Sequence, residues 1–491
     1  MTHTRKLNRP DSTAGSWPLE PAPDEMRAML DAVSERVVEH IASLPGQPAS
    51  YDTDGRAEAR QLAEDAPATG TDLKSLLDVI FDQAVPTSFN TAGPGYLAYI
   101  PGGGVFPSAL ADLIANAINR YVGVWVAAPA LVQLELNVVR WFCAAMGYGA
   151  GSGGILTSGG SLSNLTAIVT ARRERFDDDF RDGVIYTSDQ THHSVRKSAV
   201  LAGFPESAVR QIATDDRQEM RLDALADAIA ADRAADLTPF LLIGNAGSTN
   251  TGAVDPLNAL ADMAERERLW LHVDGAYGAF FMLTERGAEA LTGISRADSI
   301  TLDPHKGLFL PYGTGCLLVR DEQALRRAHA TFADYMPVMQ HDPDFVDFCD
   351  LSAELSRDFR GLRAWLPIKL FGMDAFRDAL DEKLDLARWA TEELRSIAGM
   401  QIVCEPRLSL VAFRLVPAAL DGDAVDPAAI DALNRDLMAR VNARQNVYMT
   451  GTLVDGRFAI RICVLSFRTH QDRMEQCLHD VRAAVAEVLG G

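Results

Sequence analysis

A lysine within an apolar segment is the residue of this sequence that points most directly to chemistry. Lys306 follows the run Ser299-Ile-Thr-Leu-Asp-Pro-His and stands just before Gly307. We expect it to end an apolar strand, where burial favours the neutral amine that attacks aldehydes. Most lysines are solvated, so an ordinary surface position is the alternative. The rest of the sequence decides between the two.

An aspartate 32 residues earlier (306 − 274 = 32) gives this lysine a chemical partner. The segment Trp270-Leu-His-Val-Asp-Gly-Ala-Tyr277 predicts a strand that delivers Asp274 at its end, with room for one helix and one strand before Lys306. A Schiff-base lysine and a carboxylate beside a pyridine nitrogen are the requirements of pyridoxal phosphate, whose ring then draws electrons from a substrate α-carbon. For Asp274 taken alone, helix capping is the alternative.

A glycine turn supplies a candidate phosphate site. In the segment 155–164 a strand enters the turn and then a helix, whose free amides at Gly160 and Ser161 can hold a phosphate. An ordinary Gly-Gly turn with a capping serine gives the same pattern.

Two further polar segments follow predicted strands. His192 and His193 come after the strand at 184–186, where one imidazole can stack on a planar ring or simply bond within a loop. Thr249, in the loop 247–252, can reach a cofactor oxygen or belong to a plain turn. Adjacent histidines seldom converge on a metal without further ligands, so we expect no metal site.

The elements that must position these residues follow from the apolar pattern. Apolar segments alternating with helical patterns are typical of a parallel α/β sheet, and we expect its strands at 155–157, 184–186, 240–243, 269–273, 299–302 and 316–319. Helical spacing predicts an N-terminal arm over 24–81, broken by a loop at 46–51. A glycine-rich loop, residues 94–104, follows that arm.

The last part of the sequence predicts a small α+β domain. We expect helices at 375–395 and 430–441 and strands at 408–415 and 458–464. The chain then divides into an arm with its glycine-rich loop (1–105), a large α/β domain (106–363) and the small domain (364–491).

Charge and cysteine content exclude several classes of partner. Lys plus Arg number 46 and Asp plus Glu 67 among 491 residues, and the net charge of 46 − 67 = −21 disfavours nucleic acid and anionic membranes. No secretory signal or apolar run of membrane-spanning length is visible. Six cysteines without CxxC spacing indicate neither a disulfide framework nor a zinc site, and a reducing cytoplasm fits best.

Taken in chain order, these motifs resemble the group II pyridoxal-phosphate decarboxylases, the family of aromatic-L-amino-acid, histidine and glutamate decarboxylases. The resemblance extends from Tyr96-Leu-Ala-Tyr-Ile-Pro101 through Asp-Pro-His-Lys306 to Arg357-Asp-Phe-Arg-Gly-Leu-Arg-Ala-Trp365. It implies the fold type I of pyridoxal-phosphate enzymes, a mostly parallel sheet flanked by helices, and the cofactor pyridoxal 5'-phosphate. It also implies a homodimer whose sites lie at the subunit interface, with residues 123–129 near the partner's site.

The resemblance assigns roles to individual residues. Lys306 binds the cofactor covalently, Asp274 faces its pyridine nitrogen, and His192 and Ala276 pack on opposite faces of its ring. The phosphate surroundings are Gly160, Ser161 and His305, with Thr249 nearby, and the substrate pocket takes Tyr99, Ile100 and Pro101. Tyr335 is the residue that returns a proton to the α-carbon after carbon dioxide leaves.

Some positions depart from the family's pattern and bear on the substrate. Asp303 stands where many relatives carry asparagine, and because a carboxylate repels phosphate we leave it out of the phosphate set. Ile100 and Thr91 replace phenylalanine and tryptophan of the aromatic enzymes, so the pocket is altered.

The expected reaction is α-decarboxylation of an L-amino acid, aromatic or otherwise apolar, to its amine. Oxidative decarboxylation with deamination to an aldehyde, and aminotransfer, are the alternatives on the same fold. A scaffold without activity is disfavoured, because both Lys306 and Asp274 are present.

Overall fold

The computed structural model describes residues 19–51, 55–330, 345–417 and 426–490. The chain divides into two compact units, Met1–Asn90 and Thr91–Gly491. All residues discussed for the candidate site, except Tyr335, belong to the described part of the second unit.

The first unit is helical, as predicted. Helix α1 covers Pro23–Ser43, α2 covers Gly55–Gln61, and α3 covers Leu73–Asp78 and continues into a π-helical turn at Val79–Ala84. The apolar side chains of α1 are spaced as one stripe, which remains 37% or more exposed at Met26, Met29, Leu30, Val33 and Val38.

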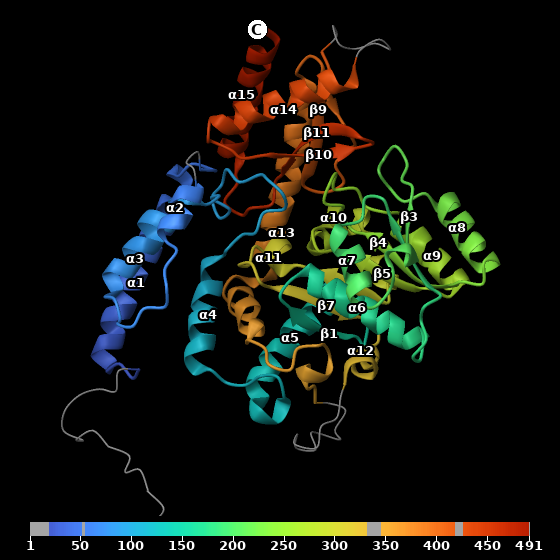
Figure 1. Cartoon of the computed structure of the whole chain (residues 1–491), viewed down its shortest axis with the longest axis horizontal. Coiled ribbons are helices and arrows are strands. Elements are labelled where there is room, and N and C mark those ends of the chain that lie inside the picture. Colours follow the sequence, from blue (N-terminus) through green and yellow to red (C-terminus); the bar gives the residue numbers. More distant parts are fainter. Residues whose placement is uncertain (1–18, 52–54, 331–344, 418–425, 491) are drawn as a thin grey trace, which may run out of the picture. The chain divides into compact units, whose positions relative to one another are not determined.

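A seven-stranded sheet is the centre of the second unit (Figure 1). Its strand order is β1-β7-β6-β5-β4-β2-β3, and the pairs among β3, β2, β4, β5 and β6 are parallel. The strands are β1 (Gly153–Thr157), β2 (Gly183–Ser188), β3 (Val209–Ile212), β4 (Thr238–Asn245), β5 (Trp270–Asp274), β6 (Ser299–Leu302) and β7 (Gly315–Val319).

Helices cover both faces of this sheet because successive side chains of each strand point to opposite faces. Ile155 of β1 packs in a cluster with α6 and α12, whereas the next residue, Leu156, packs with α5, α8 and α9. One face therefore carries α6 (Gly160–Arg175), α7 (His193–Leu201) and α12 (Glu322–His329). The other carries α5 (Pro129–Ala145), α8 (Leu222–Ala234) and α9 (Leu257–Glu267).

The sheet confirms the predicted strands and the mostly parallel arrangement that fold type I implies, and it adds one strand. Strand β7 runs antiparallel to both of its neighbours, β1 and β6, whereas the other neighbouring strands are parallel. Strand β3 was not predicted. It lies at the sheet edge, and its half-buried Arg210 and exposed Gln211 interrupt the apolar run on which the strand prediction relied.

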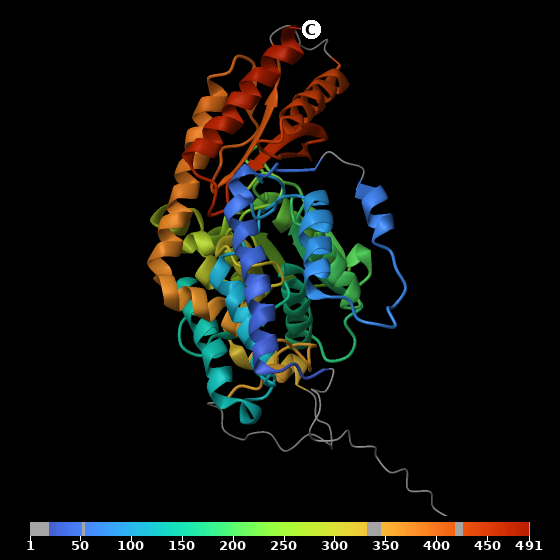
Figure 2. The same ribbon diagram turned by 90° about the vertical axis from the view of Figure 1, so that its left-hand side faces the viewer.

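A long kinked helix leads from the large sheet to a second, smaller one (Figure 2). Helix α13 covers Arg360–Arg395 and kinks at Gly372, whose φ is 75°. The small sheet has the order β10-β11-β9-β8 and is antiparallel, with strands Thr450–Val454, Arg457–Cys463, Leu410–Leu415 and Met400–Ile402 in that order. Helices α14 (Pro427–Ala443) and α15 (Gln471–Gly490) complete the small α+β domain.

Helix α13 begins earlier than the predicted helix at 375–395, because a proline in its first part, Pro367, does not end the helix. Pro367 has no N–H to donate to the carbonyl of Arg363 one turn earlier. The buried Ser108, in helix α4 (Phe106–Ile118), donates its hydroxyl to that carbonyl instead, at 2.8 Å. A side chain from another helix thus satisfies the acceptor that the proline leaves open.

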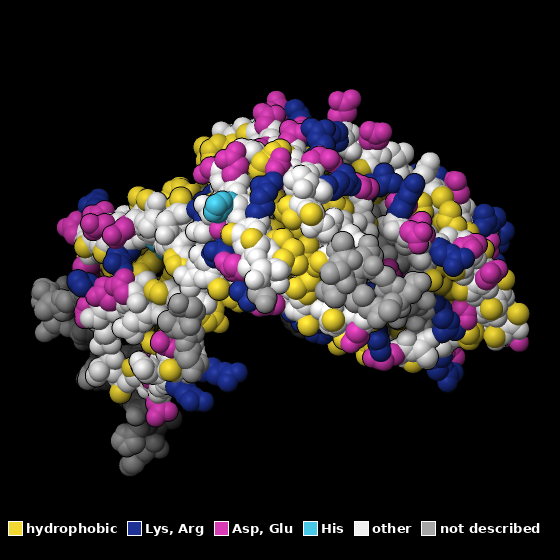
Figure 3. Space-filling view, turned by 90° about the horizontal axis from the view of Figure 1, so that it is seen from above, with side chains coloured by type: hydrophobic (Ala, Val, Ile, Leu, Met, Phe, Trp, Pro, Cys, Tyr) yellow, Lys and Arg dark blue, Asp and Glu magenta, His cyan; other side chains and the backbone are white. Residues whose placement is uncertain are grey.

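The surface of the described residues shows no predominance of basic side chains on the face drawn in Figure 3. There Lys and Arg are interspersed with Asp and Glu, as the net charge of −21 predicts. Within the described residues, none of the helices combines the length and the apolarity that crossing a membrane requires.

The pairing of Ser108 with Pro367 predicts a non-additive pair of substitutions. Ser108→Ala leaves a buried carbonyl without a donor and should lower the free energy of unfolding by about 1–3 kcal/mol in urea denaturation. Pro367→Ala restores an N–H at the missing position, so Ser108→Ala should cost much less in the Pro367→Ala background. Equal costs in both backgrounds would show that the hydroxyl does not replace the missing bond.

Candidate active site

The carboxyl ends of five strands meet at one edge of the large sheet, where parallel α/β proteins bind ligands. The residues that follow these strand ends surround a cavity of about 300 Å³. All eight predicted cofactor residues line it: Gly160, Ser161, His192, Thr249, Asp274, Ala276, His305 and Lys306. Segments separated by more than a hundred residues in sequence are therefore brought to one site.

Lys306 is held by an adjacent carboxylate. The sequence predicts that it ends strand β6, but it lies beyond the end of that strand. It belongs to the short helix α11 (Pro304–Gly307), whose first residue is a proline. Its Nζ lies 2.7 Å from Oδ2 of Asp303. Burial lowers the pKa of the Lys306 amine, but Asp303 and then Asp274 oppose it, and the pKa is raised overall. The lysine is thus an ammonium in this state of the site.

Asp303 faces the lysine rather than solvent. Its side chain is almost fully buried, and its second oxygen, Oδ1, has no hydrogen-bond partner within the described chain. A Cβ atom placed on Gly160 would lie 3.1 Å from Oδ2 of Asp303, so the carboxylate borders the glycine turn. In this structure the ammonium of Lys306 compensates the charge of the Asp303 carboxylate.

Asp274 ends strand β5, as predicted, and its carboxylate is bonded from two directions. Oδ1 accepts the backbone N–H of Ala276 at 3.2 Å, and Oδ2 accepts Nδ2 of Asn164 at 2.9 Å. These bonds hold the carboxylate at the cavity wall with lone pairs left for a further donor.

His192 precedes helix α7 and lies on the cavity wall, whereas His193 is exposed. Nδ1 of His192 accepts the backbone N–H of Ser194, and burial lowers the pKa of the ring. The neutral ring then carries its proton on Nε2. A neutral, oriented imidazole suits stacking on a planar ring.

The glycine turn presents unpaired amides to the cavity. Helix α6 begins at Gly160, and the first-turn amides of Gly160 and Ser161 have no acceptor within the described chain. His305 lies opposite. Its backbone N–H and its Nδ1 both donate to the carbonyl of Thr314, and burial lowers the pKa of its ring. This arrangement of helix amides matches the needs of a phosphate group.

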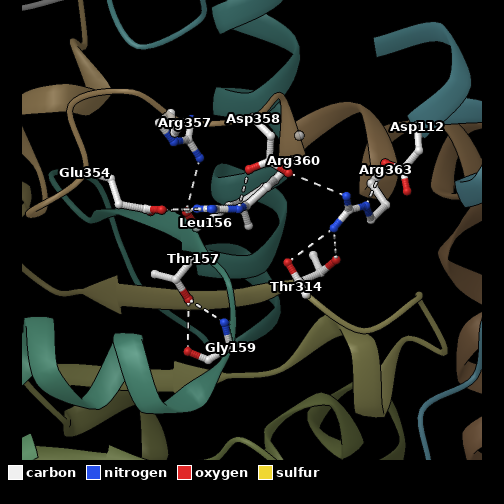
Figure 4. A network of polar contacts seen from close by, with 12 residues as sticks. Asp112, Leu156, Thr157, Gly159, Thr314, Glu354, Arg357, Asp358, Arg360 and Arg363 are labelled. Carbon is white, nitrogen blue, oxygen red and sulfur yellow. Dashed lines mark hydrogen bonds and ion pairs between the residues drawn. The ribbon is translucent and has the colours of Figure 1, made fainter. Parts of the chain in front are cut away.

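Arginines of the motif 357–365 donate hydrogen bonds to the segments on either side of this turn (Figure 4). Arg357 and Arg360 both donate to the carbonyl of Leu156 at the end of β1, at 3.1 and 3.3 Å. Arg363 donates to Gly313 and to the hydroxyl of Thr314, the residue that holds His305. The motif therefore anchors both segments that flank the predicted phosphate position.

The predicted substrate residues lie beside this cavity rather than in its wall. Tyr99, Ile100 and Pro101 are absent from the described residues that line it. Their loop packs against the segment after Lys306, because Gly103 lets the backbone approach Phe309 so closely that a Cβ would lie 2.4 Å from its Cα. Tyr99 has a φ of 49°, and Arg461 donates to its carbonyl at 2.7 Å. Tyr335 lies outside the described residues.

Sequence reasoning missed two buried polar residues, Asn164 in the cavity wall and His272, which bonds to it. Asn164 ends the segment 155–164 but has no predicted role, and His272 stands two residues before Asp274, hence on the same face of β5. That two-residue spacing is the signal that could have identified His272. Asn164 has no such signal, because only the fold brings α6 against β5.

A buried lysine, a strand-end aspartate and an open helix N-terminus around one cavity fit pyridoxal phosphate by the chemistry of their donors. The fold and the site together define a pyridoxal-phosphate enzyme of fold type I.

Comparison with known proteins places the chain more narrowly. The family described as pyridoxal-dependent decarboxylase conserved domain matches residues 56–416. An aromatic-L-amino-acid decarboxylase from Bacillus atrophaeus is 34% identical over 471 residues, which cover 96% of this chain and 97% of the relative. The chain belongs to the pyridoxal-dependent decarboxylases, which are carboxy-lyases, and its cofactor is pyridoxal phosphate.

Solved structures agree with this assignment. The tryptophan decarboxylase of Catharanthus roseus, in complex with L-tryptophan, has a TM-score of 0.88 at 26% identity and covers 96% of this chain and 100% of its own. The 4-hydroxyphenylacetaldehyde synthase of Rhodiola rosea has a TM-score of 0.87 at 26% identity, covering 95% and 99%. The backbone is thus similar in proteins with different products.

The ion pair between Asp303 and Lys306 predicts how fast the apoprotein takes up its cofactor. The amine attacks the aldehyde only when neutral, so a raised pKa slows the reaction at neutral pH, and the rate should increase as pH rises towards that pKa. Asp303→Asn removes the main cause of the raised pKa, and should speed uptake about tenfold for each unit by which the pKa falls. Stopped-flow absorbance at several pH values measures this.

A suitable control for that experiment is Asp480→Asn. Asp480 is also buried but bonds to Asn446 and Gln476 in the small domain. Asp480→Asn should leave the rate of cofactor uptake unchanged. A rate and pH profile of Asp303→Asn equal to those of the unaltered protein would contradict the role given to the ion pair.

Proposed function

We propose that this protein catalyses the α-decarboxylation of an aromatic L-amino acid to the corresponding amine and carbon dioxide. The observation that carries the proposal is the convergence of Lys306 and Asp274 on one cavity in a pyridoxal-dependent decarboxylase. The substrate class is supported by the 34% identical relative, an aromatic-L-amino-acid decarboxylase.

Different residues of the cavity hold different parts of the cofactor. Lys306 binds it covalently, the amides of Gly160 and Ser161 hold the phosphate, and His192 packs on the ring. When bound, pyridoxal phosphate supplies an electron sink for the pair released as the α-carboxylate leaves. Asp274 supports that function, because a carboxylate beside the pyridine nitrogen favours its protonated form. Ala276, Thr249 and His305 complete the set.

Asp303 would hold the Lys306 amine whenever that amine is not bound to the cofactor. The amine would then be protonated and would form the ion pair with Asp303 that it makes in this structure. This contact would keep the lysine beside the reacting atoms. We propose that Tyr335 supplies the proton to the α-carbon, as the family resemblance implies.

We propose further that the enzyme is a homodimer that acts in the cytoplasm. One side of helix α4 carries an apolar stripe that is between 37% and 51% exposed, at Phe106, Leu110, Leu113, Ile114 and Ile118. The segment after it exposes Tyr121 and Val126, and it includes residues 123–129, expected near the partner's site. A second copy would bury both. All six cysteines are free thiols, as in a reducing compartment.

A panel of L-amino acids tests the proposed reaction. Tyrosine, tryptophan and 3,4-dihydroxyphenylalanine should release carbon dioxide and amine in equal amounts, with kcat/KM about 100-fold or more above that for glutamate. Lys197→Ala, which changes an exposed lysine, should behave as the unaltered enzyme, and Lys306→Ala should be inactive.

The products separate the alternatives in that panel. Ammonia and an aldehyde in place of the amine would establish the oxidative reaction, and a keto acid without carbon dioxide would establish aminotransfer. Either result would overturn the proposal. Release of carbon dioxide from glutamate alone would leave the reaction standing and refute the aromatic substrate.

A further inference from the structure

One buried amide connects the two residues that face the predicted cofactor ring. Asn164, on the first turns of helix α6, is 1% exposed. Its Nδ2 donates to Oδ2 of Asp274 at 2.9 Å and to Oγ of Ser194 at 3.2 Å. Ser194 in turn lies 2.8 Å from Nδ1 of His192. Asn164 thus bonds directly to the carboxylate and, through one hydroxyl, to the imidazole.

A chain of hydrogen-bonded side chains leads from Asn164 to the other end of strand β5. Nε1 of Trp270 can only donate, and it donates to Oγ of Ser299 at 2.9 Å. The hydroxyl of Ser299 lies 2.8 Å from Nδ1 of His272, and Nε2 of the same ring lies 3.1 Å from Oδ1 of Asn164.

The carboxylate of Asp274 fixes the orientation of the Asn164 amide, because a carboxylate can only accept and the NH2 group must face it. Oδ1 then faces Nε2 of His272 and the hydroxyl of Thr301, which lies 2.7 Å away, and both donate to it. Burial lowers the pKa of His272 to about 4 despite the opposing effect of Asp274. The ring is neutral, and the chain brings donors but no second positive charge to the carboxylate.

The branch through Ser194 fixes the imidazole in the same way. The backbone N–H of Ser194 donates to Nδ1 of His192 at 3.3 Å, so this nitrogen is an acceptor. The hydroxyl of Ser194, which accepts from Asn164, therefore donates to the same nitrogen. His192 is therefore held by two donors, one of which depends on Asn164.

We propose that Asn164 is a positioning residue whose single amide sets both the Asp274 carboxylate and the His192 ring against the cofactor. Asn164 borders the cavity, but both hydrogen bonds of its NH2 group go to other side chains, so it acts on the cofactor site through Asp274 and His192. The proposal rests on the cofactor, whose identity the family establishes, and not on which amino acid is decarboxylated.

The isosteric change Asn164→Asp tests this proposal. It keeps the shape and the acceptor for His272 and Thr301, but it places a carboxylate oxygen where Nδ2 donates to Asp274. Pyridoxal phosphate affinity of the apoprotein should fall about 10- to 100-fold, because a buried acceptor loses its donor. The visible circular dichroism of the bound cofactor should also weaken, since the ring is held less firmly.

Asn434→Asp is the matched control. Asn434 is equally buried, but its amide bonds only to the backbone of Leu415 and Ile430 in the small domain. It should lower thermal stability without changing cofactor affinity or circular dichroism.

Ser194→Ala provides a second, milder variant that cuts only the branch to His192. The backbone N–H of residue 194 remains as one donor to the ring, so the affinity should fall less, by about 3- to 10-fold. If Asn164→Asp does not fold, the same two readouts on Ser194→Ala decide.

Cofactor affinity and circular dichroism equal to those of Asn434→Asp, in either variant that folds, would overturn the proposal. These readouts need no substrate. A failure of the positioning role can thus be told from a failure of the proposed aromatic decarboxylation, which the amino-acid panel measures.

Discussion

The burial of one amine between two carboxylates is the constraint on which this site depends. Lys306 lies in a cavity whose walls include Asp303 at 2.7 Å and Asp274. Desolvation disfavours a charged amine, whereas the carboxylates favour it, and the carboxylates prevail. A sheet that delivers several strand ends to one edge brings these groups together, since Asp274 ends β5 and Asp303 follows β6. The sheet therefore places both carboxylates beside the amine of Lys306.

Two sets of hydrogen bonds hold the segments around the cavity in place. Arg357 and Arg360 anchor the end of β1, which leads into the glycine turn, and Arg363 anchors the segment that holds His305. On the other side, the buried chain that ends at Asn164 supports the carboxylate of Asp274. Because the groups of that chain are hydrogen-bonded to one another, a substitution at one position is transmitted to the cavity wall. Positioning of this kind is needed when reacting groups must be aligned within a fraction of an ångström.

Much of this could be predicted from the sequence, because strand-end chemistry is local. Lys306, Asp274, His192 and the glycine turn each follow an apolar segment, and the order of the motifs implied one site. Contacts between distant elements were not predictable. The antiparallel direction of β7 and the edge strand β3 depend on the whole sheet, and the ion pair of Asp303 depends on the helical turn that Pro304 begins. The role of Asn164 arises only where α6 crosses β5.

The central claim is that Lys306 is the residue to which the cofactor is bound, at the site that Asp274 completes. Borohydride reduction of the yellow holoprotein, followed by proteolysis and mass spectrometry, tests it most directly. We predict that one peptide carries the reduced cofactor, that it contains Lys306, and that an aromatic amino acid added before reduction removes the label from it. A label on another lysine, or a label on Lys306 that no amino acid displaces, would contradict the account.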